Sequence, residues 1–481
     1  MTRILLLLPP SVDGRPIARD LLYGCWCSGS RAGGVTYPPV PEVLLATILS
    51  RAGHTVEVAD ANVAPAAWPK ILARAKEFDL AVSQSSWFTL EDDARALDLL
   101  RKGNPSLRTA LFGAAATFSV ETALESGGID HVIPGDPEIP LLGLADGLAE
   151  GRTLPLRIPD HHLQDMDSLP LPDRRRFLPL PPQAYTNPLP NRTPYTTVFS
   201  SRGCAGTCLF CSAPEFSGRR RRTMSPRRVL EEVRHAAKEE YRDIIFRDEH
   251  MDSPPGRLEE ICRLLRGNGK REIPGWACNI RADGVDAPLL ASMKAAGCHT
   301  IKVGVETGNS RLRANAGKPI PDETYLNVFR EVRSLGIRAH AHFLLGLPGE
   351  SAATIRETIR FARRLRPSSA TFGILTPFPG VALHRKTGGM DMAPGHGALE
   401  GFHSRALPLP WTEGLNAADL ERSVRMAYRS FYLHPAVWPG LLAGVLSPAS
   451  LIRKIRAGAQ AAVFSLSRPG KRADATRHPR R

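Results

Sequence analysis

Two long stretches of the sequence alternate short apolar runs with amphipathic helical segments, and this alternation limits the possible folds more than any other feature. The first stretch, residues 1–160, contains the apolar runs ILLLLPP, TVEVADA, LAVSQSS, RTALFGAA and DHVIPGD. Short apolar runs separated by helices are typical of a parallel sheet that is covered on both faces. We therefore expect an α/β, doubly wound domain whose ligands bind at the carboxyl ends of the strands.

The second stretch, residues 195–385, contains six strand–helix repeats. Its expected strands are TTVFSS, DIIFRDE, GWACNIRA, TIKVGVE, RAHAHFLLG and ATFGILTPF. This pattern predicts a partial (β/α)6 barrel with its chemistry at the carboxyl ends of the strands. Residues 161–194 are rich in proline and predict an extended linker that wraps one domain against the next. Residues 386–481 predict a small, mostly helical C-terminal region with a basic tail.

The composition is that of a soluble globular protein with two or three domains, since 42% of the 481 residues are hydrophobic and 23% are charged. We find no secretory signal pattern, because RILLLLPP is too short to direct export or to span a membrane. The eight cysteines do not form a disulfide pattern. These features favour a location in the reducing cytoplasm.

The chain is basic, with a net charge of +15, and much of the excess lies in arginine runs at residues 174–176 and 218–223 and in the tail from Arg468. Such an excess either attracts an anionic partner or covers a solvated surface. We interpret it mainly as a solvated surface and expect no specific nucleic-acid partner. The apolar stretch at residues 434–464 is broken by prolines and would lie on a membrane surface or form a lid over the barrel.

Three cysteines with the spacing C-x3-C-x2-C, namely Cys204, Cys208 and Cys211, follow the first expected barrel strand. A structural zinc site needs four nitrogen or sulfur ligands, and no second cysteine pair is present nearby. A cubane iron–sulfur cluster accepts one cysteine on each iron, so three cysteines leave one iron open to a cofactor or substrate. The spacing therefore favours a [4Fe–4S] cluster, with zinc or redox-active thiols as alternatives.

From this motif onward the sequence resembles the radical S-adenosylmethionine (SAM) enzymes, over most of residues 195–385. The resemblance implies that the open iron binds SAM and that an electron from a flavodoxin- or ferredoxin-type partner releases a 5′-deoxyadenosyl radical. The protein would position the reactants and exclude water and oxygen.

The resemblance also implies which residues contact SAM. Phe210 corresponds to the aromatic residue near the adenine. Asp248 and Glu249, in RDEH, stand where the family binds the methionine amino group, although the usual Gly-Gly-Glu form is absent. Three further candidates are Arg281 for the methionine carboxylate, with a plain surface arginine as the alternative, Glu306 for the ribose, and Gly346 for the turn after the fifth strand.

The first domain resembles the cobalamin-binding domain of the class B radical SAM enzymes, through YPPVPEVLLATILSRAGHTVEVADA and HVIPGDPEIPLL. In LFGAAAT, Ala114 replaces the second glycine of the family and adds a methyl group where the ligand should approach. The alternative is a degenerate sheet domain that binds no cofactor. The resemblance implies a cobalamin-binding-like site formed by Ser85, Ser86, Gly113, Thr117 and Gly135.

The family's lower-face motif D-x-H-x-x-G is missing after the first strand, and His54 is interpreted as a surface residue at a helix end. We therefore expect cobalamin to bind without a histidine below the cobalt, with the loop SQSSW, which includes Trp87, on that side. Cys25 and Cys27, in LLYGCWCSGS, would either approach the cobalamin or substrate or simply pack in the loop.

These features predict a cobalamin-dependent radical SAM enzyme, a C- or P-methyltransferase that acts on an unactivated centre of a small molecule or lipid. One alternative is a non-methylating cyclase or rearrangement enzyme, since a fold does not fix the reaction. A tRNA methylthiotransferase is another, although its additional cysteine domain and RNA-binding barrel are not recognised here. A non-enzymatic iron–sulfur sensor is the last. The sequence does not identify the substrate.

Overall fold

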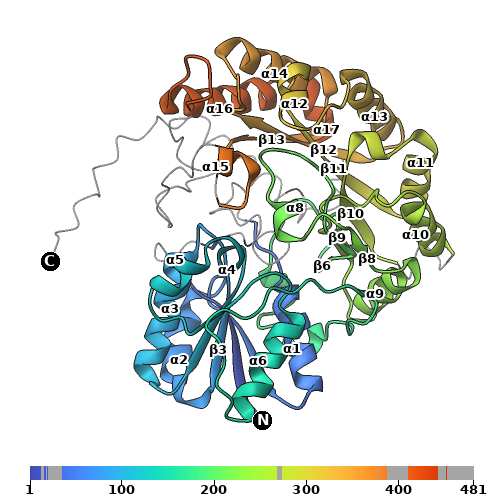
Figure 1. The fold of residues 1–481 in the computed structure, drawn as a ribbon. Helices are drawn as coiled ribbons and strands as arrows, with labels where there is room; N and C mark the ends of the chain where they lie inside the picture. Colours follow the sequence, from blue (N-terminus) through green and yellow to red (C-terminus); the bar gives the residue numbers. More distant parts are fainter. Residues whose placement is uncertain are drawn as a thin grey trace.

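The structure is a computed structural model that describes residues 1–11, 16–17, 19, 35–267, 273–377, 379–386, 410–442 and 451. Cys25, Cys27 and the basic tail lie outside these residues. Within the described part, two parallel sheets lie side by side, and the chain passes from one to the other once (Figure 1). Of the helices described, none combines the length and the apolar character needed to cross a membrane.

The N-terminal sheet has five parallel strands in the order β2-β1-β3-β4-β5. Helices cover both faces, because alternate residues of the buried strand β1 pack in opposite directions. Leu6 packs with α1 and α6, whereas Leu5 and Leu7 pack with α2, α3 and α5. The doubly wound prediction is confirmed. The elements are β1 (Arg3–Leu8), α1 (Val40–Arg51), β2 (Thr55–Asp60), α2 (Trp68–Ala73), β3 (Leu80–Ser85), α3 (Leu90–Gly103), β4 (Arg108–Gly113), α4 (Ala114–Phe118), α5 (Val120–Glu125), β5 (His131–Ile133) and α6 (Glu138–Ala149).

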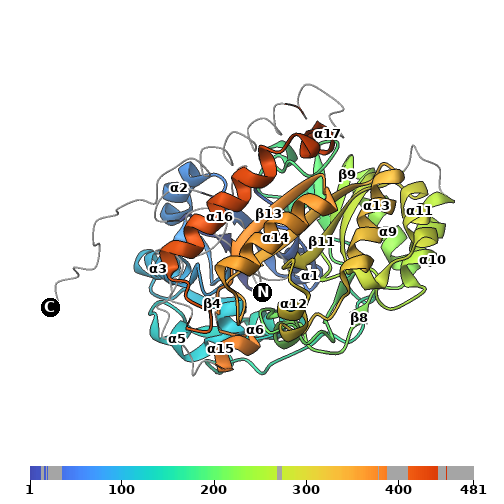
Figure 2. The same ribbon diagram turned by 90° about the horizontal axis from the view of Figure 1, so that it is seen from above.

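The second sheet has six parallel strands in the order β13-β12-β11-β10-β9-β6, so each strand neighbours the next one in the sequence. Its helices lie on the outer face, where α16 packs against β13 and α14 lies beside α16 (Figure 2). The partial barrel is therefore confirmed. The elements are β6 (Tyr195–Val198), α9 (Pro226–Lys238), β9 (Asp243–Phe246), α10 (Arg257–Arg266), β10 (Gly275–Ile280), α11 (Ala287–Ala295), β11 (Cys298–Glu306), α12 (Ser310–Asn315), α13 (Asp322–Ser334), β12 (Arg338–Leu345), α14 (Ala352–Leu365), β13 (Ser369–Ile374), α15 (Ala382–Lys386), α16 (Ala417–Tyr432) and α17 (Trp438–Leu442).

The two faces of the barrel sheet differ in polarity. Along β12, buried and half-buried residues alternate, and the buried residues Ala339, Ala341 and Phe343 belong to the core beneath the helices. The half-buried residues of the same strand, His340 and His342, lie on the inner face. The sheet thus presents an apolar outer face to its helices and a partly polar inner face.

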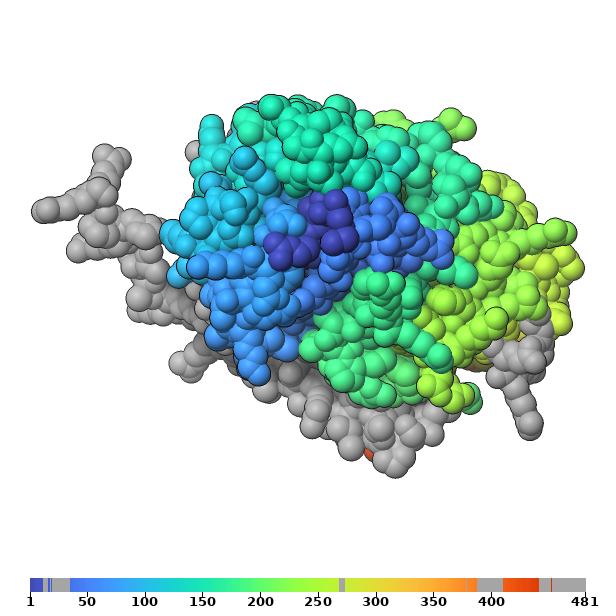
Figure 3. All heavy atoms as spheres, turned by 90° about the horizontal axis from the view of Figure 1, so that it is seen from below, coloured from blue at the N-terminus to red at the C-terminus, as the bar shows by residue number. Residues whose placement is uncertain are grey.

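Buried ion pairs join the two domains. Arg202 of β7 (Ser201–Arg202) pairs with Glu138 of α6 at 2.5 Å and with Asp136 at 3.0 Å. Arg222 of β8 (Arg222–Thr223) pairs with the same Asp136. Seen from below, the blue N-terminal domain is in direct contact with the green segments that follow it in the sequence (Figure 3).

The segment between the domains is anchored rather than loose. Tyr185 donates to Asp60 of β2 at 3.1 Å. Arg174, in the short helix α7 (Arg174–Phe177), is 2% exposed and pairs with Glu232 at 2.6 Å. The expectation that the arginine runs cover a solvated surface is therefore wrong for Arg174 and Arg222, because carboxylates of other elements hold both of them inside the protein.

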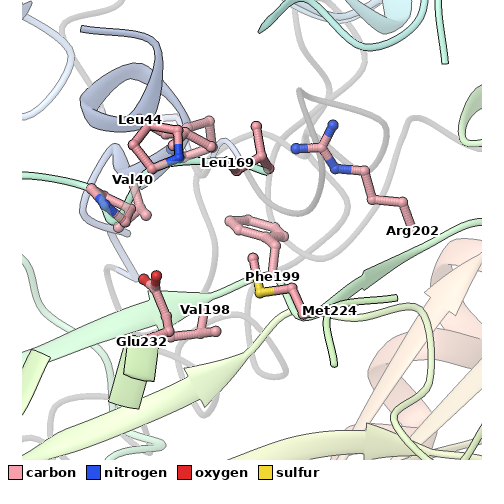
Figure 4. Close-up of a pocket in the computed structure, with 11 residues that line it drawn as sticks. Val40, Leu44, Leu169, Val198, Phe199, Arg202, Met224 and Glu232 are labelled. Carbon is pink, nitrogen blue, oxygen red and sulfur yellow. The ribbon is translucent and has the colours of Figure 1, made fainter. Parts of the chain in front are cut away.

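A small pocket lies at the domain junction (Figure 4). Its walls are mainly apolar, with Val40 and Leu44 of α1 facing Val198 and Phe199 of the barrel. Its two charged residues, Arg202 and Glu232, already belong to the buried ion pairs described above. We interpret this pocket as part of the packing between domains.

Candidate functional site

The cysteine motif lies in a loop that leaves β6 and is closed by the antiparallel pair of β7 and β8. Cys204, Cys208 and Cys211 are all half-buried. The Cys204 N–H donates to Gly218 O at 3.0 Å, which fixes one end of the loop. In the described part of the chain, no three His, Cys, Asp or Glu side chains converge to hold a metal ion. That finding is compatible with a cubane cluster, because each cysteine binds a different iron.

Residues 316–317, directly after α12, support this loop. Gly317 O lies 3.8 Å from Cys208 Sγ, and Ala316 O accepts the Leu209 N–H at 3.0 Å. Gly317 has φ +81°, and a Cβ at this position would overlap the Thr207 carbonyl. The loop therefore requires a glycine here. Sequence reasoning missed this residue because its neighbours carry no recognisable motif.

His250 and Arg221 lie beside Cys204. His250 Nδ1 is 3.2 Å from Asp252, and Arg221 Nη1 is 3.1 Å from His250 Nε2. Burial raises the pKa of the Cys204 thiol, but hydrogen bonds from His250 and the Gly206 N–H outweigh it, so the pKa is lowered. A lowered pKa favours the thiolate, the form that binds iron.

A buried ion pair lies near Cys208. Lys318 Nζ is 2.8 Å from Glu306 Oε1 and donates to Gly304 O at 2.7 Å. Burial lowers the pKa of Lys318, but the charge of Glu306 outweighs it and the pKa is raised. Glu306 has φ +68°, a left-handed conformation that turns the chain at the end of β11. The residue expected near the ribose is thus held by a lysine that the sequence analysis did not identify.

The two carboxylates of RDEH have different surroundings. Asp248 is fully buried and accepts hydrogen bonds from Ser200 Oγ at 2.9 Å and from Ser201 Oγ. Glu249 accepts the Gly203 N–H at 3.3 Å, directly beside Cys204, and burial raises its pKa. Glu249 is therefore the carboxylate that borders the cysteine loop. Asp248 instead connects the end of β9 to Ser200 and Ser201, which precede the loop.

The remaining predicted SAM contacts lie around the same loop. Arg281 is half-buried and pairs with Asp283 at 2.7 Å. The charge of Arg281 lowers the pKa of the Cys208 thiol, but burial outweighs this effect and the pKa of Cys208 is raised overall. Phe210 is 8% exposed and packs in an apolar cluster with Leu347. Gly346, with φ +93°, begins a turn that Glu350 closes by accepting the Gly346 and Leu347 N–H groups at 2.5 and 3.2 Å.

Four of the five residues predicted to bind cobalamin lie together at the carboxyl edge of the N-terminal sheet. Ser85 and Gly113 are register partners at the ends of β3 and β4. Thr117 Oγ1 donates to Gly113 O at 2.9 Å and accepts the Gly135 N–H at 3.2 Å. The Ser85 hydroxyl and the Trp87 Nε1 are buried there and have no hydrogen-bond partner among the described residues. Two such groups at one edge fit a bound ligand that supplies their partners.

Two of the assignments have local explanations. Ser86 Oγ lies 3.2 Å from Thr89 Oγ1, within the turn that precedes α3. Gly135 has φ +70°, and a Cβ there would overlap Asp160 and His161. The glycine is therefore required by the chain that passes beside it, whether or not a ligand is bound.

The interpretation of His54 as a surface residue is wrong. His54 is 7% exposed, accepts the Thr2 N–H at 3.2 Å and lies 3.0 Å from Asp146. It precedes β2, so it sits at the opposite edge of the sheet from Ser85. His161 is different, because it lies beside Gly135, and its Nε2 has no hydrogen-bond partner in the described part of the chain.

One pocket joins the edges of the two sheets. Leu8, Asn62 and Gln84 line it from the N-terminal domain, at the ends of β1, β2 and β3. Thr197, Phe199 and Arg247 line it from the barrel. The carboxyl edge of the N-terminal sheet therefore opens towards the inside of the barrel.

Comparisons with known proteins agree with this arrangement. Residues 198–362 match the Radical SAM superfamily. An uncharacterized methyltransferase of Pyrococcus horikoshii is 26% identical over 90% of this chain and 93% of its own. The anaerobic magnesium-protoporphyrin IX monomethyl ester cyclase of Rubrivivax gelatinosus is 26% identical over 71% of this chain and 63% of its own.

The fold of most of the chain has a solved counterpart. The radical SAM methyltransferase TsrM from Kitasatospora setae, solved with cobalamin and a [4Fe–4S] cluster, has a TM-score of 0.65 and 18% identity, covering 82% of this chain and 76% of its own. At this identity the likeness concerns the fold. Residues 198–362 therefore form a radical SAM domain, and the resemblance to the class B group is confirmed in the fold of both domains.

Proposed function

We propose that the protein is a cobalamin-dependent radical SAM methyltransferase that transfers a methyl group to an unactivated carbon or phosphorus centre. The observation that carries this proposal is the shared pocket between Gln84, at the edge of the N-terminal sheet, and Arg247, inside the barrel. A substrate in this space would be within reach of groups bound at both sheets.

Bound at these two places, the cluster with SAM would supply the radical chemistry and cobalamin the methyl group. The residues of the chain would hold the two cofactors and shield them from water. Cys204, Cys208 and Cys211 would bind three irons of the cluster. Phe210 and Glu249 lie against the cysteine loop and would shield a cluster bound there.

The edge of the N-terminal sheet would hold the cobalamin. Ser85 and Trp87 would find hydrogen-bond partners in it, and Gly113 and Thr117 would lie against it. We include in the proposal a flavodoxin- or ferredoxin-type electron donor and a cytoplasmic location, because an open iron requires reducing conditions. A membrane contact through residues 434–464 stays a prediction, since most of that stretch lies outside the described residues.

A non-methylating cyclase is the second candidate, supported by the similarity to the anaerobic cyclase of Rubrivivax gelatinosus. The two reactions differ in their products from SAM. A methyltransferase of this kind forms S-adenosylhomocysteine when its cobalamin is methylated, in addition to 5′-deoxyadenosine. A cyclase would form no stoichiometric S-adenosylhomocysteine.

The experiment is anaerobic reconstitution with iron, sulfide and cobalamin, followed by reduction in the presence of SAM. We expect broad visible absorption, bound cobalamin and both SAM products. The variant Cys208→Ala should lose the cluster absorption and SAM cleavage, whereas Cys262→Ala, in the buried core, should retain both. SAM cleavage by Cys208→Ala, or no cleavage by a fully loaded wild-type protein, would contradict the proposal.

A further inference from the structure

The inner face of the barrel carries a row of polar side chains at one level. Asn279 of β10, Lys302 of β11 and His340 of β12 are successive register partners across three strands. All three are half-buried, unlike the apolar residues on the outer face of the same strands. The row continues to Ser369 of β13, whose hydroxyl lies 2.7 Å from His340 Nδ1.

A second row lies closer to the carboxyl ends of the strands. His342 is the register partner of Thr371, and its Nδ1 is 2.8 Å from the threonine hydroxyl. The His340 and His342 rings are 4.6 Å apart. His340 Nε2 also lies 3.4 Å from the Thr371 hydroxyl, so neighbouring hydroxyls fix the orientation of both rings on the inner face.

Arg247 extends the first row at the other side. Ile245 is paired with Ala277, so Arg247, two residues later, is level with Asn279 and on the same face. Arg247 is 2% exposed, and its guanidinium lies 4.5 Å from the Tyr37 ring and donates to the Tyr37 hydroxyl at 3.2 Å. Arg247 also lines the pocket that joins the two domains, so its charge borders the space assigned to the substrate.

Two carboxylates stand at the ends of the strands that carry these rows, and each has a basic neighbour. Asp243, at the start of β9, lies 3.0 Å from His299, and Glu306, at the end of β11, pairs with Lys318. Between these ends, the inner face of the described strands carries Arg247, Lys302, His340 and His342 and no aspartate or glutamate. This face is therefore electropositive at the level of the two rows.

We propose that the substrate carries an oxyanion group, a carboxylate or a phosphate or phosphonate, which binds to Lys302 and His340 on the inner face of the barrel, within reach of Arg247. This inference rests on the proposed function and specifies its substrate class. Charge-assisted hydrogen bonds of this kind orient a small molecule as well as binding it.

The test measures anion binding by the reconstituted holoprotein with SAM, using isothermal titration calorimetry. The probes are inorganic phosphate and succinate, with 1,4-butanediol as an uncharged control. We expect at least one anion to bind and the diol not to bind. Preference for phosphate or for succinate identifies the phospho or the carboxylate form of the substrate group.

Variants localise the site. Lys302→Met should weaken binding of the preferred anion about tenfold, and Lys302→Arg should restore most of it. Lys238→Met, an exposed lysine on α9, should bind like the wild type. Bound anion should also protect His340 from diethyl pyrocarbonate, as read by mass spectrometry of the peptide.

Equal affinity of Lys302→Met and wild type, or binding of the diol as strong as that of the anions, would overturn the inference. So would the absence of anion binding in a protein that cleaves SAM normally. If an anion binds at Lys302 but the loaded protein does not cleave SAM, the proposed function fails instead.

Discussion

Individual side chains around the cysteine loop set its electrostatics, and two of them were invisible in the sequence. Lys318 and His250 follow different strands and are brought to Cys208 and Cys204 only by the closing of the barrel. The cysteines themselves could be predicted because their spacing is local. A lysine that pairs with Glu306 twelve residues earlier leaves no such pattern.

The Lys318–Glu306 pair gives a prediction on stability. Removing one partner leaves the other charge buried without compensation, so Lys318→Met should lower the free energy of unfolding by about 3–5 kcal/mol. The double variant Lys318→Met, Glu306→Gln should recover most of this loss, which chemical denaturation would measure. A double variant as unstable as Lys318→Met alone would show that packing of the lysine, and not its charge, is what matters.

Glu350 gives a prediction on pH dependence. Burial raises its pKa to about 7, although the Gly346 and Leu347 N–H groups lower it. In the unfolded chain Glu350 loses its proton above its usual pKa of about 4.5, whereas in the folded protein it keeps the proton up to about pH 7. The free energy of unfolding therefore falls as the pH rises from about 4.5 to 7. The loss should be about 3 kcal/mol by linkage.

The variant Glu350→Gln can still accept both N–H groups and should remove this part of the pH dependence, as measured by denaturation between pH 5 and 8. Glu42 contributes a separate part, because burial also raises its pKa to about 7. Glu121→Gln, on the surface, should keep the wild-type slope. An unchanged slope for Glu350→Gln would mean that Glu350 is ionised in the folded protein.

At the scale of elements, the sequence predicted strands better than the connections between them. The strands β1 and β3 are buried along nearly their whole length because both faces of the N-terminal sheet are covered, and such short runs are recognisable locally. The path of residues 161–194 is different, since Arg174 and Tyr185 are fixed by carboxylates from α9 and β2. Those partners lie far away in the sequence. The proline content therefore predicted that residues 161–194 are extended, but not that their side chains are fixed against both domains.

The segment 316–317, which follows α12, contacts the cysteine loop, and this contact can be tested by one substitution. Gly317→Ala should strain a backbone at φ +81° and push the added methyl group into the Thr207 carbonyl. We expect poor cluster loading and a loss of more than about 2 kcal/mol in stability. Gly151→Ala is the matched control, because it has φ +69° with no atom within 4 Å of the added Cβ, and should cost only about 1 kcal/mol. Equal effects of the two variants would show that the contact with Thr207 is unimportant.

On the scale of the whole molecule, the ion pairs at the domain junction hold the two sheets in a fixed relation. Arg202 belongs to the strand that closes the cysteine loop, and its partners Asp136 and Glu138 lie one and three residues after Gly135, at the edge proposed to bind cobalamin. The two proposed cofactor sites are thus connected through a few residues. The sequence predicted both domains but could not predict this connection, because it depends on side chains that meet only after both domains have folded.

The manner in which the cobalt is held is a property of the whole arrangement. His54 and His131 both lie at the amino edge of the N-terminal sheet, since each precedes or begins its strand, and their ring nitrogens contact Asp146 and Pro155. Neither reaches the edge where Ser85 and Trp87 lie. We therefore expect cob(II)alamin bound to this protein to show no nitrogen splitting from a histidine in electron paramagnetic resonance. A weakly held lower position would favour four-coordinate cob(I)alamin, the form that accepts a methyl group from SAM.

His161 provides the decisive control, because it is the histidine beside Gly135 whose Nε2 lacks a partner in the described residues. The spectrum of the variant His161→Ala should match that of the wild type, as should the spectrum of His54→Ala. Nitrogen splitting that is present in the wild type and lost in His161→Ala would identify a histidine ligand that replaces the missing motif. In that case Ser85→Ala should leave the splitting intact. Under our expectation, Ser85→Ala removes one neutral hydrogen bond between the buried serine hydroxyl and cobalamin, and weakens cobalamin binding about fivefold.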